Sequence, residues 1–256
     1  MLELNRVYNE DCIGEHGMCL IPDGFIDLIL CDLPYGTTRC KWDSIIPLDK
    51  LWKEYLRIIK PNGAIVLTCD EPFTSVLISS NLKHFRTKWI WDKVKANGFL
   101  NAKRQPMKRY EEVVVFSKQA CTYNPQMTKG EMRRKQAYNR NAGTGEMVYG
   151  KFDNIATFNN DKYPTNIIVF SNANQRHKLH PTEKPVPLFE YLIRTYSNPS
   201  AVILDNCIGS GTTAVATMQV GGNRQFIGYE ISNDYCEITR QRIRQVLECK
   251  NSEVSK

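Results

Sequence analysis

The sequence predicts an open, largely parallel α/β sheet that is doubly wound, with helices covering both faces. Short runs rich in branched and aromatic residues alternate along the chain with helical patterns, as is typical of such sheets. A strand, a glycine-rich loop and a helix also follow one another from residue 201. The 256 residues are 42% hydrophobic, enough for one sizeable core or two small ones, which excludes a disordered or disulfide-stapled miniature protein.

The predicted strands are short apolar runs, which indicate burial on both faces of a sheet. In chain order they cover residues 25–31, 64–69, 89–91, 112–116, 167–170, 201–204 and 226–229. Because Trp89 and Trp91 form the third run, we expect them in the core.

Five helical patterns lie between or after these strands, at residues 48–59, 72–80, 187–197, 212–220 and 233–248. In the third, Phe189, Leu192 and Tyr196 recur at the i, i+3, i+7 spacing of one buried face. Ser232 is a suitable N-cap for the last helix. We expect a frayed polar tail at residues 251–256.

Residues 119–162 depart from this alternation. They hold few apolar runs, four glycines and many asparagines, so we expect an insertion without sheet structure. Seven Lys and Arg outnumber four acidic residues here, and a solvated loop is the alternative to a functional region. The predicted organisation is one domain whose halves cover residues 1–118 and 163–250, interrupted by this insertion.

Charge and cysteine content narrow the class of protein. The formal net charge of +7 favours polyanionic partners, although many other proteins share it. Nine cysteines include no Cys-x-x-Cys pair, which indicates reduced thiols. No apolar run reaches the ~18 residues of a membrane span, and the first ten residues are too polar for a signal peptide, so we expect a cytoplasmic protein without membrane contact.

The first functional motif follows the strand at residues 25–31. It reads Asp32, Leu33, Pro34, Tyr35, Gly36. In an open parallel sheet the functional crevice lies beyond the carboxyl ends of strands, so an acid and an aromatic residue are well placed there for chemistry. A turn with a capping aspartate is the alternative.

The second motif begins at the strand 201–204. Asp205 follows it, then a loop with Gly209 and Gly211, then a helix and another strand that ends at Glu230, 21 residues beyond Gly209. Glycines and a helix start suit a close-packed ligand, and the late carboxylate suits ribose hydroxyls, so an adenosine-type cofactor is predicted. A nicotinamide-dependent oxidoreductase fits the same glycines, but Asp205 would repel a pyrophosphate and suits the sulfonium of S-adenosylmethionine.

These motifs resemble those of the S-adenosylmethionine-dependent DNA amino-methyltransferases. Residues 32–35 look like their Asp-Pro-Pro-Tyr motif, residues 180–185 (His-Pro-Thr-Glu-Lys-Pro) like the segment before the cofactor loop, and residues 205–213 like that loop. The motif order is that of the permuted beta class, which implies a Rossmann-like methyltransferase fold. Leu33 in place of the first proline and Cys207 in place of a usual phenylalanine depart from the pattern.

The resemblance implies methyl transfer from S-adenosylmethionine to the exocyclic amine of a flipped base in double-stranded DNA. Asp32 and the Leu33 carbonyl would accept the two N–H groups of that amine, Pro34 would stiffen the turn and Tyr35 would stack on the base. An Asp at the head of the motif favours adenine N6, with cytosine N4 as the alternative. Cytosine C5 chemistry lacks its Pro-Cys pair, and no metal is expected.

The resemblance also implies the remaining site residues. Glu230 would bind the ribose, Asp11 would lie near the adenine ring, and the insertion would read the target sequence. A homodimer is left open, as is an inactive DNA-binding relative. The other cofactor candidates are Thr182, Lys184, Asp205, Gly209, Ser210, Gly211 and Thr212, and the DNA candidates are Arg133, Arg134, Lys135 and Arg140, with Lys103, Arg104, Lys108 and Arg109 as a second basic stretch.

Overall fold

The computed structural model describes residues 2–36, 44–135, 157–172 and 183–254. The chain forms two compact units. One comprises Met1–Asn124 and Asn166–Lys256, and the other comprises Pro125–Thr165.

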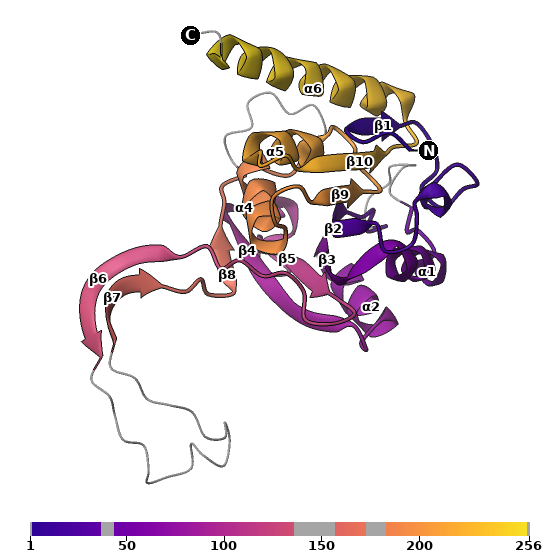
Figure 1. Cartoon of the computed structure of the whole chain (residues 1–256). Helices are drawn as coiled ribbons and strands as arrows, with labels where there is room; N and C mark the ends of the chain where they lie inside the picture. Colours follow the sequence, from indigo (N-terminus) through magenta and orange to yellow (C-terminus); the bar gives the residue numbers. More distant parts are fainter. Residues whose placement is uncertain (1, 37–43, 136–156, 173–182, 255–256) are drawn as a thin grey trace. The chain divides into compact units, whose positions relative to one another are not determined.

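The first unit is built on an eight-stranded sheet (Figure 1). Among its described strands β5 alone runs antiparallel to its neighbours, so the predicted open, largely parallel sheet is confirmed. Most strands extend beyond their apolar runs, and the short first strand was not predicted. In spatial order the strands are β1 (Arg6–Tyr8), β10 (Gln225–Tyr229), β9 (Val202–Asp205), β2 (Ile26–Asp32), β3 (Ile59–Cys69), β5 (Lys108–Phe116), β4 (Phe85–Asn97) and β8 (Ile167–Val169).

Helices cover both faces of this sheet, as expected of a doubly wound fold. Two short 3-10 helices, η1 (Met18–Leu20) and η2 (Phe99–Asn101), lie in the connections. The α-helices α1 (Leu48–Ile58) and α2 (Phe73–Ser80) pack on one face, while α4 (Val186–Tyr196), α5 (Thr212–Val220) and α6 (Asn233–Val254) pack on the other.

The last helix corrects one expectation. Residues 251–254 are helical, whereas a frayed tail was predicted from residue 251. Lys250 donates a hydrogen bond to the Met218 carbonyl in α5, and Ser252 bonds the Cys249 carbonyl at 2.6 Å. These contacts satisfy polar groups near the end of α6, and so they stabilise a helix end that would otherwise fray.

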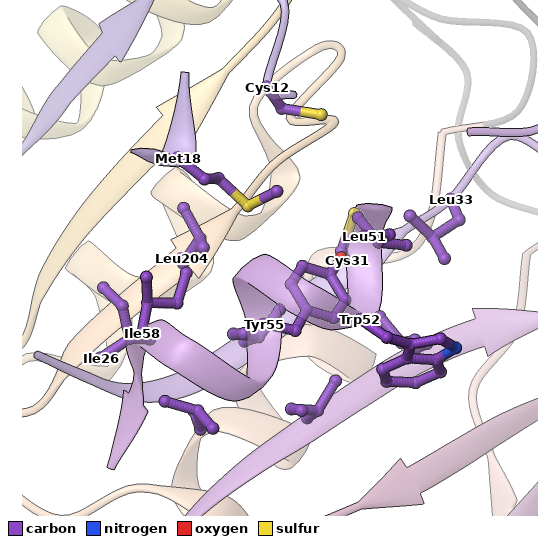
Figure 2. Packing of buried hydrophobic residues seen from close by; sticks show 14 of the residues in the cluster. Cys12, Met18, Ile26, Cys31, Leu33, Leu51, Trp52, Tyr55, Ile58 and Leu204 are labelled. Atoms are coloured by element: carbon purple, nitrogen blue, oxygen red, sulfur yellow. The ribbon is translucent and has the colours of Figure 1, made fainter. Parts of the chain in front are cut away.

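The core consists of layers on the two faces of the sheet, set by the alternation of side chains along each strand. In β2, Ile29 and Cys31 face α1, where Tyr55 is fully buried (Figure 2). Leu28 and Leu30 point the other way and pack against α4. Because both faces of β2 are buried from Leu28 to Cys31, no polar residues alternate with its apolar ones there, so this part of its sequence is a continuous apolar run.

The two tryptophans lie in the second of these layers, as predicted. Trp89 and Trp91 are 4% and 0% exposed. Each indole N–H has a partner, the Tyr196 hydroxyl at 2.7 Å and the Phe170 carbonyl at 2.8 Å.

The second unit overturns another expectation, because its described residues form a two-stranded antiparallel sheet. β6 (Thr128–Lys135) pairs with β7 (Thr157–Lys162), where an insertion without sheet was predicted. The strands are polar and therefore lack the apolar alternation that indicates a strand in a sequence. Their pairing depends on backbone bonds and on cross-strand contacts such as the ion pair between Lys129 and Asp161.

Within the described part of the chain, no helix combines the length and the apolar character that crossing a bilayer requires. The eight cysteines that the structure describes are all free thiols.

Candidate active site

The two predicted motifs lie on neighbouring strands. Asp32 is the last residue of β2 and Asp205 the last of β9, and these two parallel strands pair directly. From β2 the chain winds through β3 toward one edge of the sheet, whereas β9 is followed by β10 toward the other. Such a reversal is the position where open α/β sheets bind ligands beyond the carboxyl ends of the strands.

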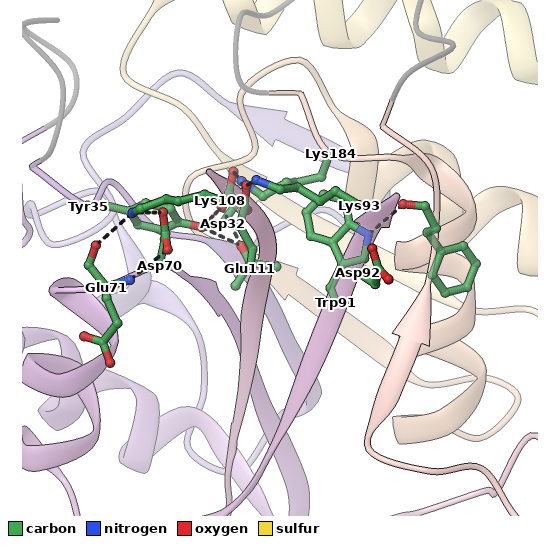
Figure 3. A network of polar contacts seen from close by, with 12 residues as sticks. Asp32, Tyr35, Asp70, Glu71, Trp91, Asp92, Lys93, Lys108, Glu111 and Lys184 are labelled. Atoms are coloured by element: carbon green, nitrogen blue, oxygen red, sulfur yellow. Dashed lines mark hydrogen bonds and ion pairs between the residues drawn. The ribbon is translucent and has the colours of Figure 1, made fainter. Parts of the chain in front are cut away.

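Asp32 is held by three donors (Figure 3). Its Oδ1 accepts hydrogen bonds from the Tyr35 hydroxyl at 2.7 Å and from the Thr68 hydroxyl in β3. Its Oδ2 accepts from Lys184 Nζ at 2.8 Å. A carboxylate has about four acceptor positions, so about one remains for a further donor. The side chain is 25% exposed, which leaves that position accessible.

Lys184 connects Asp32 to a second buried ion pair. Its Nζ lies 3.4 Å from Glu111 Oε2, and Glu111 Oε1 accepts a hydrogen bond from Lys93 Nζ at 3.0 Å. The side chains of Lys184 and Lys93 are only 7% and 4% exposed. Burial lowers the pKa of Lys184, but the carboxylates of Asp32 and Glu111 raise it above its usual value, so the side chain is cationic.

The carboxyl group of Glu111 is the counterpart of these ammonium groups. Burial raises its pKa, but Lys184 and Lys93 lower it more, so the net shift is downward. The four side chains therefore form a chain of alternating charges that ends at Asp32. Buried charges of this kind are tolerated only when paired.

The residues after Asp32 are anchored by packing. Leu33 is 4% exposed and belongs to the core layer under α1, so the departure from proline provides a different anchor for the same backbone. Pro34 is half-buried. The Tyr35 ring stacks on Phe73 with centroids 5.5 Å apart, and Lys184 Nζ lies 5.3 Å from the Tyr35 centroid.

The glycine loop between β9 and α5 adopts a conformation that requires glycine. Gly209 and Gly211 have φ of +52° and +87°, in the left-handed region. A Cβ on Gly209 would meet nothing nearer than 3.9 Å, so open space borders its backbone. At Gly211 a Cβ would lie 2.5 Å from the Thr239 methyl group of α6. Ser210 and Thr212 beside them are buried.

Asp205 organises this loop from within. Its Oδ1 accepts the Cys207 N–H at 3.0 Å and its Oδ2 accepts the Thr213 hydroxyl. Burial raises the pKa of this carboxyl to about 7, although both hydrogen bonds lower it. Cys207 itself is half-buried, and its sulfur lies 3.5 Å from the Asn206 amide nitrogen.

Glu230 closes the loop from the end of β10. Its Oε2 accepts the Gly209 N–H at 3.0 Å and its Oε1 accepts the Ser232 N–H at 2.8 Å. Burial raises the pKa of this carboxyl, opposed by these backbone hydrogen bonds. The acid predicted 21 residues downstream of Gly209 thus lies in direct contact with that glycine.

Two residues of α6 that the sequence did not single out also hold the loop. The Thr239 hydroxyl donates to the Gly209 carbonyl at 2.7 Å, and Arg242 Nη1 donates to the Ser210 carbonyl at 2.7 Å. Arg242 also pairs with Glu183 at 2.9 Å, which ties the segment before α4 to the same loop. A helix surface gives no sequence signal for such contacts.

Lys93, Glu111 and Thr68 were missed as well, although a signal for two of them exists. Lys93 follows the buried Trp91 by two positions, and Glu111 precedes the buried Val113 by two. Because strand side chains alternate with period two, both charges fall in phase with a buried row. A charge in that phase predicts a buried ion pair.

Other predicted residues lie in a turn, in the second unit or outside the described residues, and their roles stay predictions. Asp11 is exposed and caps a turn through the Ile13 N–H at 3.0 Å. Thr182 and Arg140 fall outside the described residues. The basic run 133–135 belongs to β6 of the second unit. Of the described residues, no group of three or more His, Cys, Asp or Glu is arranged to hold a metal ion.

Comparison with known proteins decides the family. A model of the N6/N4 methyltransferase family, described as DNA methylase, matches residues 26–241, which is most of the chain. The chain belongs to this family of DNA methylases. The predicted resemblance is confirmed, and with it S-adenosylmethionine as the methyl donor that the family uses and DNA as its substrate class. The nicotinamide-dependent alternative is set aside.

Individual relatives include enzymes named for either base. The DNA adenine methyltransferase YhdJ of Escherichia coli (strain K12) is 25% identical over 260 residues, covering 94% of this chain and 83% of that protein. The structure of the PvuII DNA methyltransferase, described as cytosine-N4-specific, matches with a TM-score of 0.66 at 14% identity, covering 96% of this chain and 90% of that one. That of M1.HpyAVI with SAM matches with a TM-score of 0.62 at 21% identity, covering 93% and 98%. The predicted methyltransferase fold is thereby confirmed.

Proposed function

We propose that this DNA methylase transfers a methyl group to adenine N6 in double-stranded DNA, with Asp32 as the residue that contacts the amine. The observation that carries this proposal is the accessible acceptor position of Asp32, on the strand next to the cofactor loop. An aspartate at the head of the motif supports adenine over cytosine N4.

The amine of a base is a poor nucleophile because its lone pair is delocalised into the ring. Asp32 accepts one N–H of this amine and the Leu33 carbonyl accepts the other, which favours a pyramidal nitrogen. These hydrogen bonds strengthen as the N–C bond forms and the nitrogen becomes positive, so they stabilise the transition state more than the ground state. The bond between the methyl carbon and the sulfur would break as the N–C bond forms, with its electron pair staying on the sulfur, and one proton would then pass from the nitrogen to solvent.

The buried ion pairs position Asp32 for this role. Lys184 fixes Oδ2 and the hydroxyls of Thr68 and Tyr35 fix Oδ1, so the carboxylate cannot rotate freely. A preorganised acceptor needs little rearrangement when charge develops at the amine. Lys184 therefore acts as a positioning residue through Asp32, which differs from the contact with the cofactor carboxylate that the resemblance implies.

The loop between β9 and α5 fits S-adenosylmethionine. Open space next to the Gly209 backbone and the start of α5 suit the approach of a polar ligand, and the half-buried Glu230 suits a pair of ribose hydroxyls. Asp205 supplies negative charge near the loop, and Ser210, Gly211 and Thr212 line its backbone. When bound, the cofactor supplies an electrophilic methyl group on a positively charged sulfur.

Tyr35 and the second unit complete the assignment on the DNA side. We assign Tyr35 the stacking contact with a base that has left the duplex, since an amine inside the helix cannot reach the site. The unit Pro125–Thr165 is assigned to target recognition, with Arg133, Arg134 and Lys135 of β6 among its contacts to DNA.

The test of this function is methyl transfer from radiolabelled S-adenosylmethionine to unmethylated DNA, with mass spectrometry of the product nucleosides. Wild-type protein is expected to yield N6-methyladenine. Asp32→Ala is expected to lower the rate at least about 100-fold, the scale of losing one transition-state hydrogen bond, while cofactor and DNA binding persist. Asp32→Asn keeps the shape and controls for loss of folding.

Two results would contradict the proposal in different ways. N4-methylcytosine as the product would move the assignment to the other base of the family. Equal transfer by wild type and by Asp32→Ala would remove Asp32 from the mechanism.

A further inference from the structure

The hairpin that joins β4 to β5 carries exposed apolar side chains at its tip. Phe99 and Leu100, adjacent in η2, are 79% and 96% exposed. Met107 and Tyr110, on the returning arm, are exposed as well. Exposing several apolar side chains of one hairpin to water is unfavourable, and groups of them mark interaction sites more often than isolated exposed residues do.

The same hairpin is strongly basic. Residues 94–110 contain five Lys and Arg and no Asp or Glu. Lys108 pairs with Asp70 at 2.7 Å, and Arg109 pairs with a carboxylate at the base of the hairpin. Within the described ranges, no carboxylate pairs with Lys95, Lys103 or Arg104. An apolar tip flanked by such cations is complementary to a polyanion with an apolar interior, which is the character of a nucleic acid duplex.

The hairpin projects from the sheet at the carboxyl ends of the parallel strands, which is the end where the active site lies. The pairing registers across β3 and β5 place Asp32 level with Trp89 of β4. β4 continues to Asn97, eight residues beyond Trp89, and at ~3.3 Å per residue this extension spans roughly 26 Å. That length is ample for crossing a DNA groove, since grooves are about 6–12 Å wide.

The base of the hairpin is fixed to the catalytic network. Lys93 on β4 and Glu111 on β5 connect through Lys184 to Asp32 (Figure 3). Just beyond, Val94 has φ of +67°, a left-handed conformation that a β-branched residue rarely adopts. The strand pairing is irregular between Asp92 and Asn97, so the tip departs from the regular sheet while the base of the hairpin stays paired.

We infer that the hairpin tip is an apolar wedge that enters double-stranded DNA beside the target base, with Lys95, Lys103 and Arg104 on the phosphates. This inference rests on the proposed function. A base that leaves the stack opens a gap, and apolar side chains placed between base steps stabilise an opened duplex. Phe99 and Leu100 insert between base steps near the opened position, which offsets part of the cost of flipping the base.

The test compares duplex DNA with the same DNA after heat denaturation, because a single strand has no stack to open. The double variant Phe99→Ala/Leu100→Ala changes only exposed side chains. We expect its initial rate of methyl transfer on duplex DNA to fall about tenfold or more, with less than about a twofold change on the denatured DNA. The measured quantity is the ratio of the two rates.

A matched control removes an exposed apolar side chain elsewhere. Leu82, between α2 and β4, is 67% exposed, and Leu82→Ala should leave both rates unchanged. Lys103→Gln/Arg104→Gln should weaken duplex binding and lower the salt slope of log Kd by about two, one for each lost phosphate contact.

Several outcomes would overturn the wedge. These are an equal loss on both forms of DNA, no loss on either, or a changed oligomeric state of Phe99→Ala/Leu100→Ala in size-exclusion chromatography, which would assign the tip to a second copy. If wild-type protein transfers no methyl group at all, the proposed function fails. Fluorescence anisotropy with labelled DNA then tests the wedge separately. If the wedge exists, Phe99→Ala/Leu100→Ala still binds duplex DNA more weakly than wild type and binds single strands with unchanged affinity.

Discussion

At the scale of single residues, burial decides what an ion pair contributes. Lys184 and Lys108 each lie at nearly the same distance from an aspartate, 2.8 and 2.7 Å. The Lys184 side chain is 7% exposed and that of Lys108 is 48% exposed. Water screens the second pair, whereas the first cannot be broken without leaving charges in a poorly solvated site.

We therefore expect Lys184→Met and Lys108→Met to differ in stability. Lys184→Met leaves Asp32 without its ammonium group and Glu111 with Lys93 alone. It should lower the free energy of unfolding by about 2–4 kcal/mol, which is less than for a fully buried pair because Asp32 is partly exposed. Lys108→Met should cost about 0–1 kcal/mol. Urea denaturation measures both. Equal losses would show that the difference in burial has no energetic consequence here.

Lys184→Met also separates two roles for this lysine. If Lys184 positions Asp32, kcat falls while the dissociation constant for S-adenosylmethionine stays within about threefold of the wild-type value. If it binds the cofactor carboxylate, that dissociation constant rises by at least about tenfold, the scale of a charged hydrogen bond. Calorimetric titration of the cofactor distinguishes the two results.

At the scale of elements, the cofactor loop depends on the packing of α6 against it. Gly211 and Gly221 flank α5, and both have positive φ, +87° and +66°. A Cβ on Gly211 would lie 2.5 Å from the Thr239 side chain, whereas a Cβ on Gly221 would meet nothing within 4 Å. An alanine at Gly221, where ψ is −143°, would therefore meet backbone strain alone, whereas an alanine at Gly211, where ψ is +24°, would meet both strain and a steric conflict.

We expect Gly221→Ala to lower the free energy of unfolding by about 1–3 kcal/mol, the cost of an alanine at φ +66° and ψ −143°, a conformation that essentially only glycine adopts. Gly211→Ala should cost about 1–2 kcal/mol for a left-handed alanine and a further ~1–3 kcal/mol from overpacking, and it should also weaken S-adenosylmethionine binding. Thermal unfolding and calorimetry measure the two effects. If Gly211→Ala binds the cofactor as tightly as Gly221→Ala, the contact with Thr239 does not set the loop conformation.

Sequence patterns predicted the elements with strong apolar periodicity and missed the polar ones. The helix at 212–220 was predicted with its observed bounds, and β2 was placed within one residue. β6 and β7 have no apolar phase, because a two-stranded ribbon has no core to face. Apolar periodicity can report only burial, so polar pairing leaves no such pattern.

The residues of the site also divide into those that the sequence patterns predicted and those that they missed. Asp32, Gly209 and Glu230 were found because they follow strands whose carboxyl ends share an edge of the sheet. The donors around them, such as Arg242, come from a helix far along the chain, and their contacts depend on tertiary packing. Sequence therefore indicated the candidate groups of the site, and the structure was needed to show what orients them.

At the scale of the whole molecule, the larger unit does not depend on the smaller one for sheet pairing. β6 and β7 pair with each other, and the eight-stranded sheet includes neither of them. Both ends of the junction are anchored on the larger unit. The Asn124 N–H bonds the Thr195 carbonyl at 2.7 Å, and the Ile90 N–H bonds the Asn166 carbonyl at 2.8 Å.

Replacing Pro125–Thr165 with a flexible Gly/Ser linker that joins these two anchors should therefore leave the larger unit folded. We expect cooperative thermal unfolding and S-adenosylmethionine binding within about threefold of the full chain, because no ladder bond of the eight-stranded sheet is removed. Duplex binding should weaken by about tenfold or more, since the basic residues of β6 are lost. If the shortened protein lost both cofactor binding and cooperative unfolding, the larger unit would need the smaller one to fold. Unchanged duplex affinity would instead assign DNA binding to the larger unit alone, with the β4–β5 hairpin as its principal contact.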